Sequence, residues 1–416
     1  MNLSEELVWR GFLHQTTYKD IKSIDNKKIV FYHGYDVSSD SQTIGNLAAM
    51  MLDRCLLRHG HKAIIVAGGA TSLVGDPGGK EDERELQSLE TIAHNTKCAE
   101  EQIKRVFSGF DFTLVNNLDW THKMGVLDYL RDYGKHFSMT PLIQRDYIAR
   151  RIGEKGTGIS YAEFSYTILQ GIDYLHLYDE YNCTLQLGGS DQWGNCLSGV
   201  DLIRRARGVE VNVLSLPLII NKATGKKFGK SEDGAVWLDP LKTSPLDFYQ
   251  FWINSDDQGV ISYIKIFTEL SKDEVEKLES AQKANPASRV AQKALAFEVT
   301  KIVHGNDIAK HVESLTDVLT GKSSITEVNK NTLVELKDYL KLLVVDKHKT
   351  VTDILVSSGL ASSNTEARRL LEDGSIYLNN AKISDDHIDF SKIKSDHLMI
   401  RRGKAYKDTV FLEIKK

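Results

Sequence analysis

The chain has few of the features that mark secreted, membrane-bound or disordered proteins. Its 416 residues include only six prolines, and no stretch is of low complexity. The first residues, Met-Asn-Leu-Ser-Glu-Glu, lack the basic start and the apolar run of a signal peptide. No segment is an apolar run of about 18 residues, the length that would indicate a transmembrane helix. We therefore expect a soluble, cytoplasmic protein that does not enter a membrane.

Cysteine is also scarce. The four cysteines, Cys55, Cys98, Cys183 and Cys196, show no Cys-x-x-Cys spacing, so neither a zinc site nor a disulfide framework is predicted. Reduced thiols and no protein-built metal site are expected. The net charge of −4 gives no sign of a general nucleic-acid binder. A local basic patch is nevertheless compatible with a slightly acidic total.

The composition is that of an ordinary globular protein, with 41% apolar and 26% charged residues, but 416 residues are too many for one compact core. From Lys28 to about Ile220, short apolar runs alternate with helical stretches. The runs are Ile29 to Tyr32, Ala63 to Ala67, Phe112 to Val115, Leu185 to Leu187 and Leu214 to Ile220. This alternation predicts a Rossmann-like parallel sheet with crossover helices and ligand space above the strand ends. In the first unit, the crossover helix is expected from about Ile44 to His59.

The chain after this sheet predicts three further regions. Residues 244–320 have apolar residues at helical spacing and no strand pattern, which indicates a helical domain. Residues 321–349 are polar and lysine-rich at both ends, as expected of a linker around one amphipathic helix. Residues 350–416 combine helix patterns with a strand-like run, which indicates a small α+β domain. With the Rossmann-like domain at residues 1–243, the predicted fold class is α/β.

Two segments could form a nucleotide site. Val37 to Asn46 joins a predicted strand to a helix, and a helix N-terminus suits a phosphate because its N–H groups are unpaired. Gly45 would let a base or ribose approach the backbone. Taken alone, this segment is equally compatible with a structural cap. The second segment, Lys226 to Ser231, is a glycine-containing turn with three lysines, which alone would indicate only a solvated basic turn.

Together these two segments resemble the HIGH and KMSKS motifs of class I aminoacyl-tRNA synthetases. In that family they hold the ATP phosphates while a carboxylate attacks the α-phosphate, so the chemistry is positioning and charge stabilisation. The resemblance implies catalytic roles for Thr43, Asn46, Lys227, Lys230 and Ser231. Thr43 and Asn46 stand where the motif has its two histidines. The Asn46 amide can still donate a hydrogen bond, but a threonine hydroxyl carries no imidazolium charge.

A further set of polar side chains shares one stripe of a predicted helix at 164–178. Tyr166, Gln170 and Asp173 are spaced i, i+4 and i+7. A buried, unpaired carboxylate is costly, so Asp173 either satisfies internal donors or accepts a hydrogen bond from a ligand hydroxyl. Three segments resemble tyrosyl-tRNA synthetases of the bacterial type: Gly68 to Pro77, Glu163 to Tyr166 and Gly188 to Asn195. The resemblance covers the first 320 residues and, more loosely, the rest.

This resemblance implies the contents of the site. Tyr32 and Asp173 would bond the phenol hydroxyl of tyrosine. The other tyrosine-binding residues would be Thr71, Asp76, Asn117, Tyr166, Gln170 and Gln192. The ATP contacts would come from His33, Gly34, Asp36, Ser38, Gly45, Gly189, Asp191 and Lys230. Lys80 and Arg84 would reach the pyrophosphate in the transition state.

The last region resembles an S4-type RNA-binding domain. Ser363 and Glu366 predict a capped helix that carries Arg368 and Arg369. A strand-like run at Ser375 to Leu378 and an Asn-Asn turn follow, and a basic cluster lies further on at Arg401, Arg402 and Lys404. Such a module would grip tRNA through its backbone and shape. A solvated surface would account for the same charges.

The function implied by the resemblance is ligation of tyrosine to tRNA(Tyr), with tyrosyl-adenylate as the intermediate. ATP would enter with Mg²⁺. A homodimer is expected, with Trp120 to Phe137 at its interface. Two alternatives stay open: a tryptophanyl-tRNA synthetase, which the pair of Tyr32 and Asp173 disfavours, and a catalytically weakened RNA-binding descendant, with which Thr43 is compatible.

Overall fold

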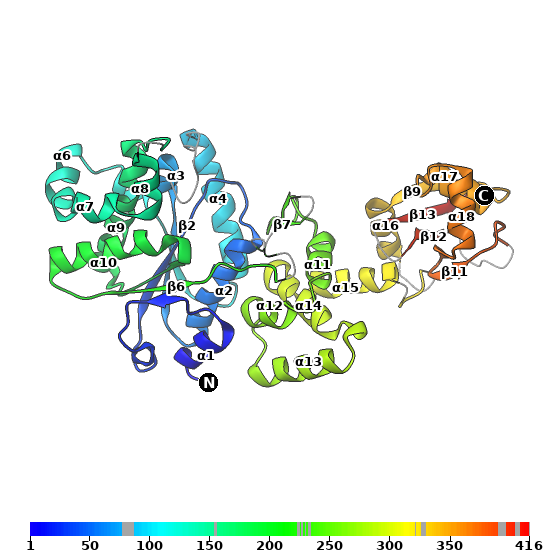
Figure 1. The fold of residues 1–416 in the computed structure, drawn as a ribbon, viewed down its shortest axis with the longest axis horizontal. Coiled ribbons are helices and arrows are strands. Elements are labelled where there is room, and N and C mark those ends of the chain that lie inside the picture. The colour runs from blue at the N-terminus through cyan, green and yellow to red at the C-terminus, as the bar shows by residue number, and fades with distance from the viewer. Residues whose placement is uncertain are drawn as a thin grey trace. The chain divides into compact units, whose positions relative to one another are not determined.

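The computed structural model describes the chain except for residues 77–86, 154–155, 223–224, 226–227, 229, 232–233, 321, 326–329, 390–396, 404–407 and 416. The described residues form two compact units, Met1–Gly305 and Asn306–Lys416 (Figure 1). No described helix is both long enough and apolar enough to span a bilayer.

The first unit is built on a six-stranded sheet in the order β1-β6-β5-β2-β3-β4. Its strands are β1 Gln15–Thr16, β2 Val30–Tyr35, β3 Lys62–Ala67, β4 Phe112–Asn116, β5 Leu185–Gly189 and β6 Asn212–Leu216. All neighbours pair in parallel except β1, which is antiparallel to β6 at the edge. The predicted parallel sheet is therefore confirmed. Strand β6 ends four residues earlier than expected because Pro217 has no N–H for a ladder.

Helices cover both faces of this sheet. They are α1 Leu3–Arg10, α2 Ile44–Arg58, α3 Gly69–Val74, α4 Leu89–Val106, α5 Leu118–Thr121, α6 Val126–Asp128, α7 Met139–Ile143, α8 Asp146–Ile152, α9 Tyr161–Tyr181 and α10 Trp193–Arg207. Successive side chains of a strand face opposite sides, and β2 uses this directly. Tyr32 packs with Ile168 and Ile172 of α9, whereas His33 and Tyr35 reach Asp53 of α2.

A short hairpin and four helices follow the sheet. They are β7 Lys230–Ser231, β8 Gly234–Ala235, α11 Pro245–Ile253, α12 Val260–Phe267, α13 Lys272–Ala284 and α14 Val290–His304. Helices α11, α12 and α13 pack on α14. Their core contains the fully buried rings of Phe248, Trp252 and Phe267, which explains the helical spacing of apolar residues in this region.

The second unit contains a five-stranded sheet in the order β11-β10-β12-β13-β9. Its elements are α15 Asn306–Thr320, α16 Lys330–Tyr339, β9 Lys341–Val345, α17 Val351–Ser358, α18 Asn364–Glu372, β10 Ile376–Leu378, β11 Ala381–Ile383, β12 His397–Arg402 and β13 Thr409–Ile414. Asn379 and Asn380 both have positive φ, as a two-residue hairpin turn requires.

Strand β9 differs from the sequence-based expectation. Residues 341–345 pair in parallel with β13, although they were predicted to belong to a connecting segment. Leu343 and Val345 face the apolar core of this unit, whereas Leu342 and Val344 are exposed. The apolar run is only four residues long and directly follows a helix, so its strand character is set by the distant partner β13 rather than by local pattern.

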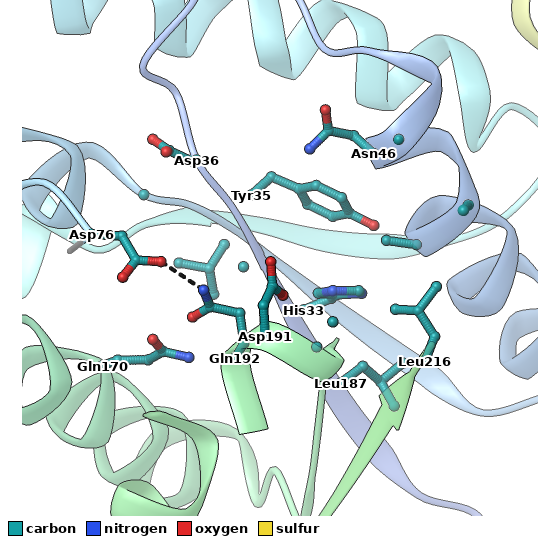
Figure 2. A pocket seen from close by; sticks show the side chains of 18 of the residues that line it. His33, Tyr35, Asp36, Asn46, Asp76, Gln170, Leu187, Asp191, Gln192 and Leu216 are labelled. Carbon is teal, nitrogen blue, oxygen red and sulfur yellow. Dashed lines mark hydrogen bonds between the residues drawn. The ribbon is translucent and has the colours of Figure 1, made fainter. Parts of the chain in front are cut away.

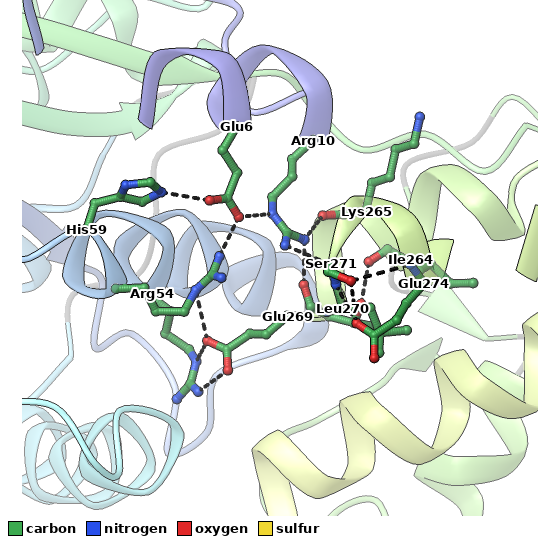
Figure 3. A network of polar contacts seen from close by, with 12 residues as sticks. Glu6, Arg10, Arg54, His59, Ile264, Lys265, Glu269, Leu270, Ser271 and Glu274 are labelled. Atoms are coloured by element: carbon green, nitrogen blue, oxygen red, sulfur yellow. Dashed lines mark hydrogen bonds and ion pairs between the residues drawn. The ribbon is translucent and has the colours of Figure 1, made fainter. Parts of the chain in front are cut away.

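A buried ion network joins the N-terminal helix to the helical region of the first unit (Figure 3). The Glu6 carboxylate accepts from Arg10 at 2.6 Å, from Arg58 at 2.6 Å and from His59 at 2.7 Å. Arg10 in turn donates to the carbonyl oxygens of Lys265, Thr268 and Leu270. Burial alone would raise the pKa of Glu6, but these three donors outweigh it and lower the pKa to about 2.

Acid should unfold the first unit through this network. Because the pKa of Glu6 is depressed on folding, its contribution is complete above the ordinary value of 4.5 and is lost as the pH falls from there toward 2. We expect Glu6→Gln to lower the unfolding free energy at pH 7 by about 3 kcal/mol, since Arg10 loses its counter-charge and Arg58 keeps only the longer contact of 3.5 Å to Glu269. Urea unfolding followed by circular dichroism at pH 7 and pH 3 measures this. The exposed Glu276→Gln is the control, and equal losses in both variants would contradict the prediction.

Candidate active site

The site is a cavity of about 550 Å³ at the carboxyl ends of the central strands, where an open parallel sheet places its ligands. The start of α2 and one stripe of α9 complete its wall (Figure 2). Sixteen of the predicted residues line it: Tyr32, His33, Gly34, Asp36, Thr43, Gly45, Asn46, Thr71, Asp76, Asn117, Tyr166, Gln170, Asp173, Gly189, Asp191 and Gln192. Ser38 lies beside the cavity, where its N–H donates to Asp36.

One part of the cavity is built around a buried carboxylate. Asp173 accepts from Nδ2 of Asn117 at 3.0 Å and from Nε1 of Trp120 at 2.9 Å. Burial raises the pKa of Asp173 to about 7, against the opposing effect of these two donors. Trp120, on α5, was not among the predicted site residues. No local sequence pattern indicates a role for Trp120, because its partner Asp173 is 53 residues away in the sequence.

Three buried polar atoms around the cavity have no hydrogen-bond partner among the described residues. They are the hydroxyl of Tyr32, Oε1 of Gln170 and Oε1 of Gln186. Burial raises the pKa of Tyr32 well above its ordinary value, so its hydroxyl keeps its proton. Buried polar groups are almost always satisfied, and each exception calls for an explanation. A ligand with a hydroxyl and a cationic group would satisfy the first two atoms.

Two further residues of the cavity wall, Gln192 and Asp76, are hydrogen-bonded to each other. Nε2 of Gln192 donates to Asp76 at 2.6 Å, a contact drawn in Figure 2. Nδ2 of Asn195 donates to Oε1 of Gln192 at 3.0 Å. Because both ends of the Gln192 amide are bonded, its orientation is fixed and Asp76 keeps its carboxylate at the cavity wall.

The start of α2 is organised around Asn46. The backbone N–H of Thr43 donates to Oδ1 of Asn46 at 3.0 Å, and the Thr43 hydroxyl lies 2.9 Å from the same oxygen. A backbone N–H can only donate, so this contact assigns the oxygen of the amide unambiguously. The NH₂ group of Asn46 is therefore left to face the cavity, as Figure 2 shows. Thr43 therefore orients the side chain of Asn46.

Within the segment from Lys226 to Ser231, the structure describes the side chain of Phe228. Phe228 is buried against Tyr263 at 4.4 Å between ring centroids, with Phe251, Trp252 and Phe267 within 5.7 Å. Its N–H donates to the carbonyl of Ile219. Lys80, Arg84 and Lys227 lie outside the described residues. The backbone of Lys230 and Ser231 forms β7, but their side chains also lie outside the described part of the chain.

The predicted RNA-binding residues are placed differently from one another. Arg368 and Arg369 are exposed on α18. Arg402 is half-exposed and contacts Glu366 and the carbonyl of Leu360. Arg401 is buried, and its guanidinium donates to the carbonyl of Leu319, so it does not contribute to a basic surface. Lys404 lies outside the described residues.

Comparisons with known proteins agree on one family. A model described as class I tRNA synthetases (W and Y) matches residues 24–319, and one described as a tyrosine–tRNA ligase SYY-like C-terminal domain matches residues 334–407. Tyrosine–tRNA ligase 2 of Bacillus cereus is 40% identical over 97% of this chain and 98% of its own length. Tyrosine–tRNA ligase of Listeria welshimeri is also 40% identical, with the same coverage of both chains.

Solved structures give the same result. The C-terminally truncated mitochondrial tyrosyl-tRNA synthetase of Aspergillus nidulans is 30% identical, with a TM-score of 0.69 over 76% of this chain and 93% of that one. A tryptophanyl-tRNA synthetase of Encephalitozoon cuniculi is 14% identical with a TM-score of 0.55, covering 74% of this chain and 89% of that one, which is a likeness of fold alone. The chain belongs to the class I tRNA synthetases for tryptophan and tyrosine, and within them to the tyrosine–tRNA ligase family.

Proposed function

We propose that this protein is a tyrosine–tRNA ligase that activates L-tyrosine with ATP and transfers it to the terminal adenosine of tRNA(Tyr). The observation that carries the proposal is the pair of Tyr32 and Asp173 in the cavity wall, a partnerless buried hydroxyl and a buried carboxylate. The phenol of tyrosine would donate to Asp173 and accept from Tyr32. An indole could not do both. This supports tyrosine over tryptophan as the substrate.

The remaining residues of the cavity divide between the two substrates. Oε1 of Gln170 and the carboxylate of Asp76 would receive the α-ammonium of tyrosine, with Tyr166, Thr71, Asn117 and Gln192 around them. Gly34, Asp36, Gly45, Gly189 and Asp191 would border the adenosine. The NH₂ of Asn46 and the start of α2 would meet the phosphates, joined by Ser38, Lys80, Arg84, Lys227, Lys230 and Ser231.

In the first step, a tyrosine carboxylate oxygen bonds to the α-phosphorus as the bond from that phosphorus to the leaving pyrophosphate breaks. In the second, a hydroxyl of the terminal adenosine attacks the tyrosyl carbonyl and AMP leaves. No protein group must become covalently attached, so the side chains act by positioning and by charge. Mg²⁺ would enter on the phosphate oxygens of ATP. The one described cluster of potential ligands, Glu6, Cys55 and His59, lies elsewhere, and its carboxylate is taken by arginines.

For tRNA, the exposed Arg368 and Arg369 on α18, together with Arg402, would contact the phosphate backbone. Cytoplasmic translation is the setting we propose, and the free thiols of all four cysteines are compatible with a reducing compartment. The decayed RNA-binding alternative is disfavoured because all eight residues proposed to bind tyrosine line one cavity, and the 40% identity spans nearly the whole chain.

We also propose a homodimer through the predicted interface from Trp120 to Phe137, extended by α7 and the start of α9. Its exposed apolar side chains are Val126, Leu127, Leu130, Met139, Ile143 and Tyr161. Leu127→Asp should convert the dimer to a monomer. Each of the two subunits would bury one aspartate charge in a twofold interface, so the cost is incurred twice. Sedimentation equilibrium measures this. Leu241→Asp is the matched control, since Leu241 is 94% exposed elsewhere in the chain. A Leu127→Asp variant that stays dimeric would contradict the proposed interface.

The function itself is tested by aminoacylation of purified transcripts. With ATP and Mg²⁺, tRNA(Tyr) should accept tyrosine, and tRNA(Trp) should accept neither tyrosine nor tryptophan. Charging of tRNA(Trp) with tryptophan would overturn the assignment in favour of the sister enzyme. Absence of any charging would favour the decayed descendant.

A further inference from the structure

A second buried carboxylate lies just behind the cavity wall. Asp53, on α2, is completely buried and accepts from Nδ1 of His33 at 2.8 Å and from the hydroxyl of Tyr35 at 2.5 Å. His33 and Tyr35 are two residues apart on β2, so they share the face of the sheet that α2 covers. Both line the cavity, whereas Asp53 does not.

The chemistry of these contacts determines which nitrogen of a neutral imidazole carries the proton. A carboxylate only accepts hydrogen bonds, so Nδ1 of His33 must carry the proton that it shares with Asp53. Burial, the charge of Asp53 and the hydrogen bond to it raise the pKa of Tyr35 well above its ordinary value, so Tyr35 also remains a donor. In the neutral ring, Nε2 is then left as an acceptor. No described residue bonds to Nε2.

The position of His33 selects the part of the nucleotide that it would meet. Asn46 and Asp53 are seven residues apart on α2, which is two helical turns, and the phosphates are expected at the Asn46 end. His33, on β2, contacts α2 at Asp53, farther from the helix N-terminus than Asn46, where the ribose would follow the phosphates. The ribose hydroxyls are donors, and an acceptor nitrogen complements them.

We propose that Asp53 is a positioning residue that fixes the ring and tautomer of His33, so that Nε2 of His33 accepts a hydrogen bond from a ribose hydroxyl of ATP. The inference rests on the proposed function, because it assumes that ATP occupies this cavity. This role explains why a carboxylate and its two hydrogen-bond donors are buried together behind the site. Three apolar side chains in the same place would not require a charge to be removed from water.

The test compares ATP with 2′-deoxy-ATP and 3′-deoxy-ATP in tyrosine-dependent pyrophosphate exchange. The unmodified protein should discriminate against one deoxynucleotide by about tenfold in kcat/KM, the effect of one hydrogen bond. In Asp53→Asn the new amide can donate to Nδ1 and turn Nε2 into a donor. We expect this variant and His33→Ala to lose about tenfold with ATP, to leave KM for tyrosine unchanged, and to use the affected deoxynucleotide as well as ATP.

Asp201→Asn, at an exposed carboxylate on α10, should keep the discrimination. Equal use of all three nucleotides by the unmodified protein would overturn the inference without any variant. The inference would also be overturned if Asp53→Asn or His33→Ala still discriminated between ATP and the deoxynucleotides. Equal losses in kcat/KM for ATP and for tyrosine would overturn it too. The proposed function fails separately, through absence of any tyrosine-dependent exchange.

Discussion

Asp173→Asn should lower kcat/KM for tyrosine activation by about 10- to 100-fold, the effect expected when a hydrogen bond to a charged group is lost. The loss in kcat/KM should be large because the substitution has two unfavourable effects. Asparagine offers the phenol a weaker acceptor. Its NH₂ group must also face one of the two donors, Asn117 or Trp120, that now point at the carboxylate. Two opposed donors in a buried position are costly.

The same change should reduce the preference for tyrosine over phenylalanine. In the unmodified protein, phenylalanine would leave both the Tyr32 hydroxyl and the Asp173 carboxylate without the partner that tyrosine supplies. The selectivity therefore depends on the free-energy cost of leaving these groups unpaired. Asp173→Asn lowers that cost when phenylalanine is bound, and it also weakens the hydrogen bond to the phenol of tyrosine. Pyrophosphate exchange with each amino acid gives the ratio. Asp179→Asn, on the same helix but in a surface ion pair, is the control. An unchanged ratio in Asp173→Asn would contradict the assignment.

Phe228→Ala should lower kcat for tyrosine activation by at least about tenfold, with little change in KM for tyrosine. The Phe228 side chain lies in a socket of four aromatic rings. Removing a buried phenylalanine side chain costs about 3–5 kcal/mol. In the proposed reaction Lys227 and Lys230 hold the phosphates, and there a displacement of about 1 Å can cost on the order of 100-fold.

Phe228→Leu is the matched variant, since it keeps an apolar side chain in the socket and should keep most of the activity. Steady-state exchange kinetics and thermal melting are measured on both variants. If Phe228→Ala melts earlier yet retains its kcat, the ring serves stability alone and the loop is positioned by other contacts.

The features that could be predicted from the sequence are those with a local period. The i, i+4, i+7 spacing of Tyr166, Gln170 and Asp173 suffices to place them on one stripe of α9, and all three line the cavity. The alternation of apolar runs and helices likewise predicts the parallel sheet. Both patterns depend only on the geometry of one helix or one strand.

The features that could not be predicted depend on partners distant in the sequence. Trp120 contacts Asp173 and Asp53 contacts His33, but the sequence around Trp120 and Asp53 marks neither of them. Strand β9 exists because β13 pairs with it. Arg401 and Arg402 look alike as a basic pair, yet adjacent strand residues face opposite sides, so only one of them remains near the surface. Charge in a sequence does not reveal the direction of a side chain.

The most direct test of this account is exchange of pyrophosphate into ATP in the presence of each of three amino acids, tyrosine, tryptophan and phenylalanine. Rapid exchange is expected with tyrosine and at most slow exchange with the other two, because only the tyrosine phenol can both donate to Asp173 and accept from Tyr32. No exchange with tyrosine, or exchange with tryptophan at an equal rate, would contradict it.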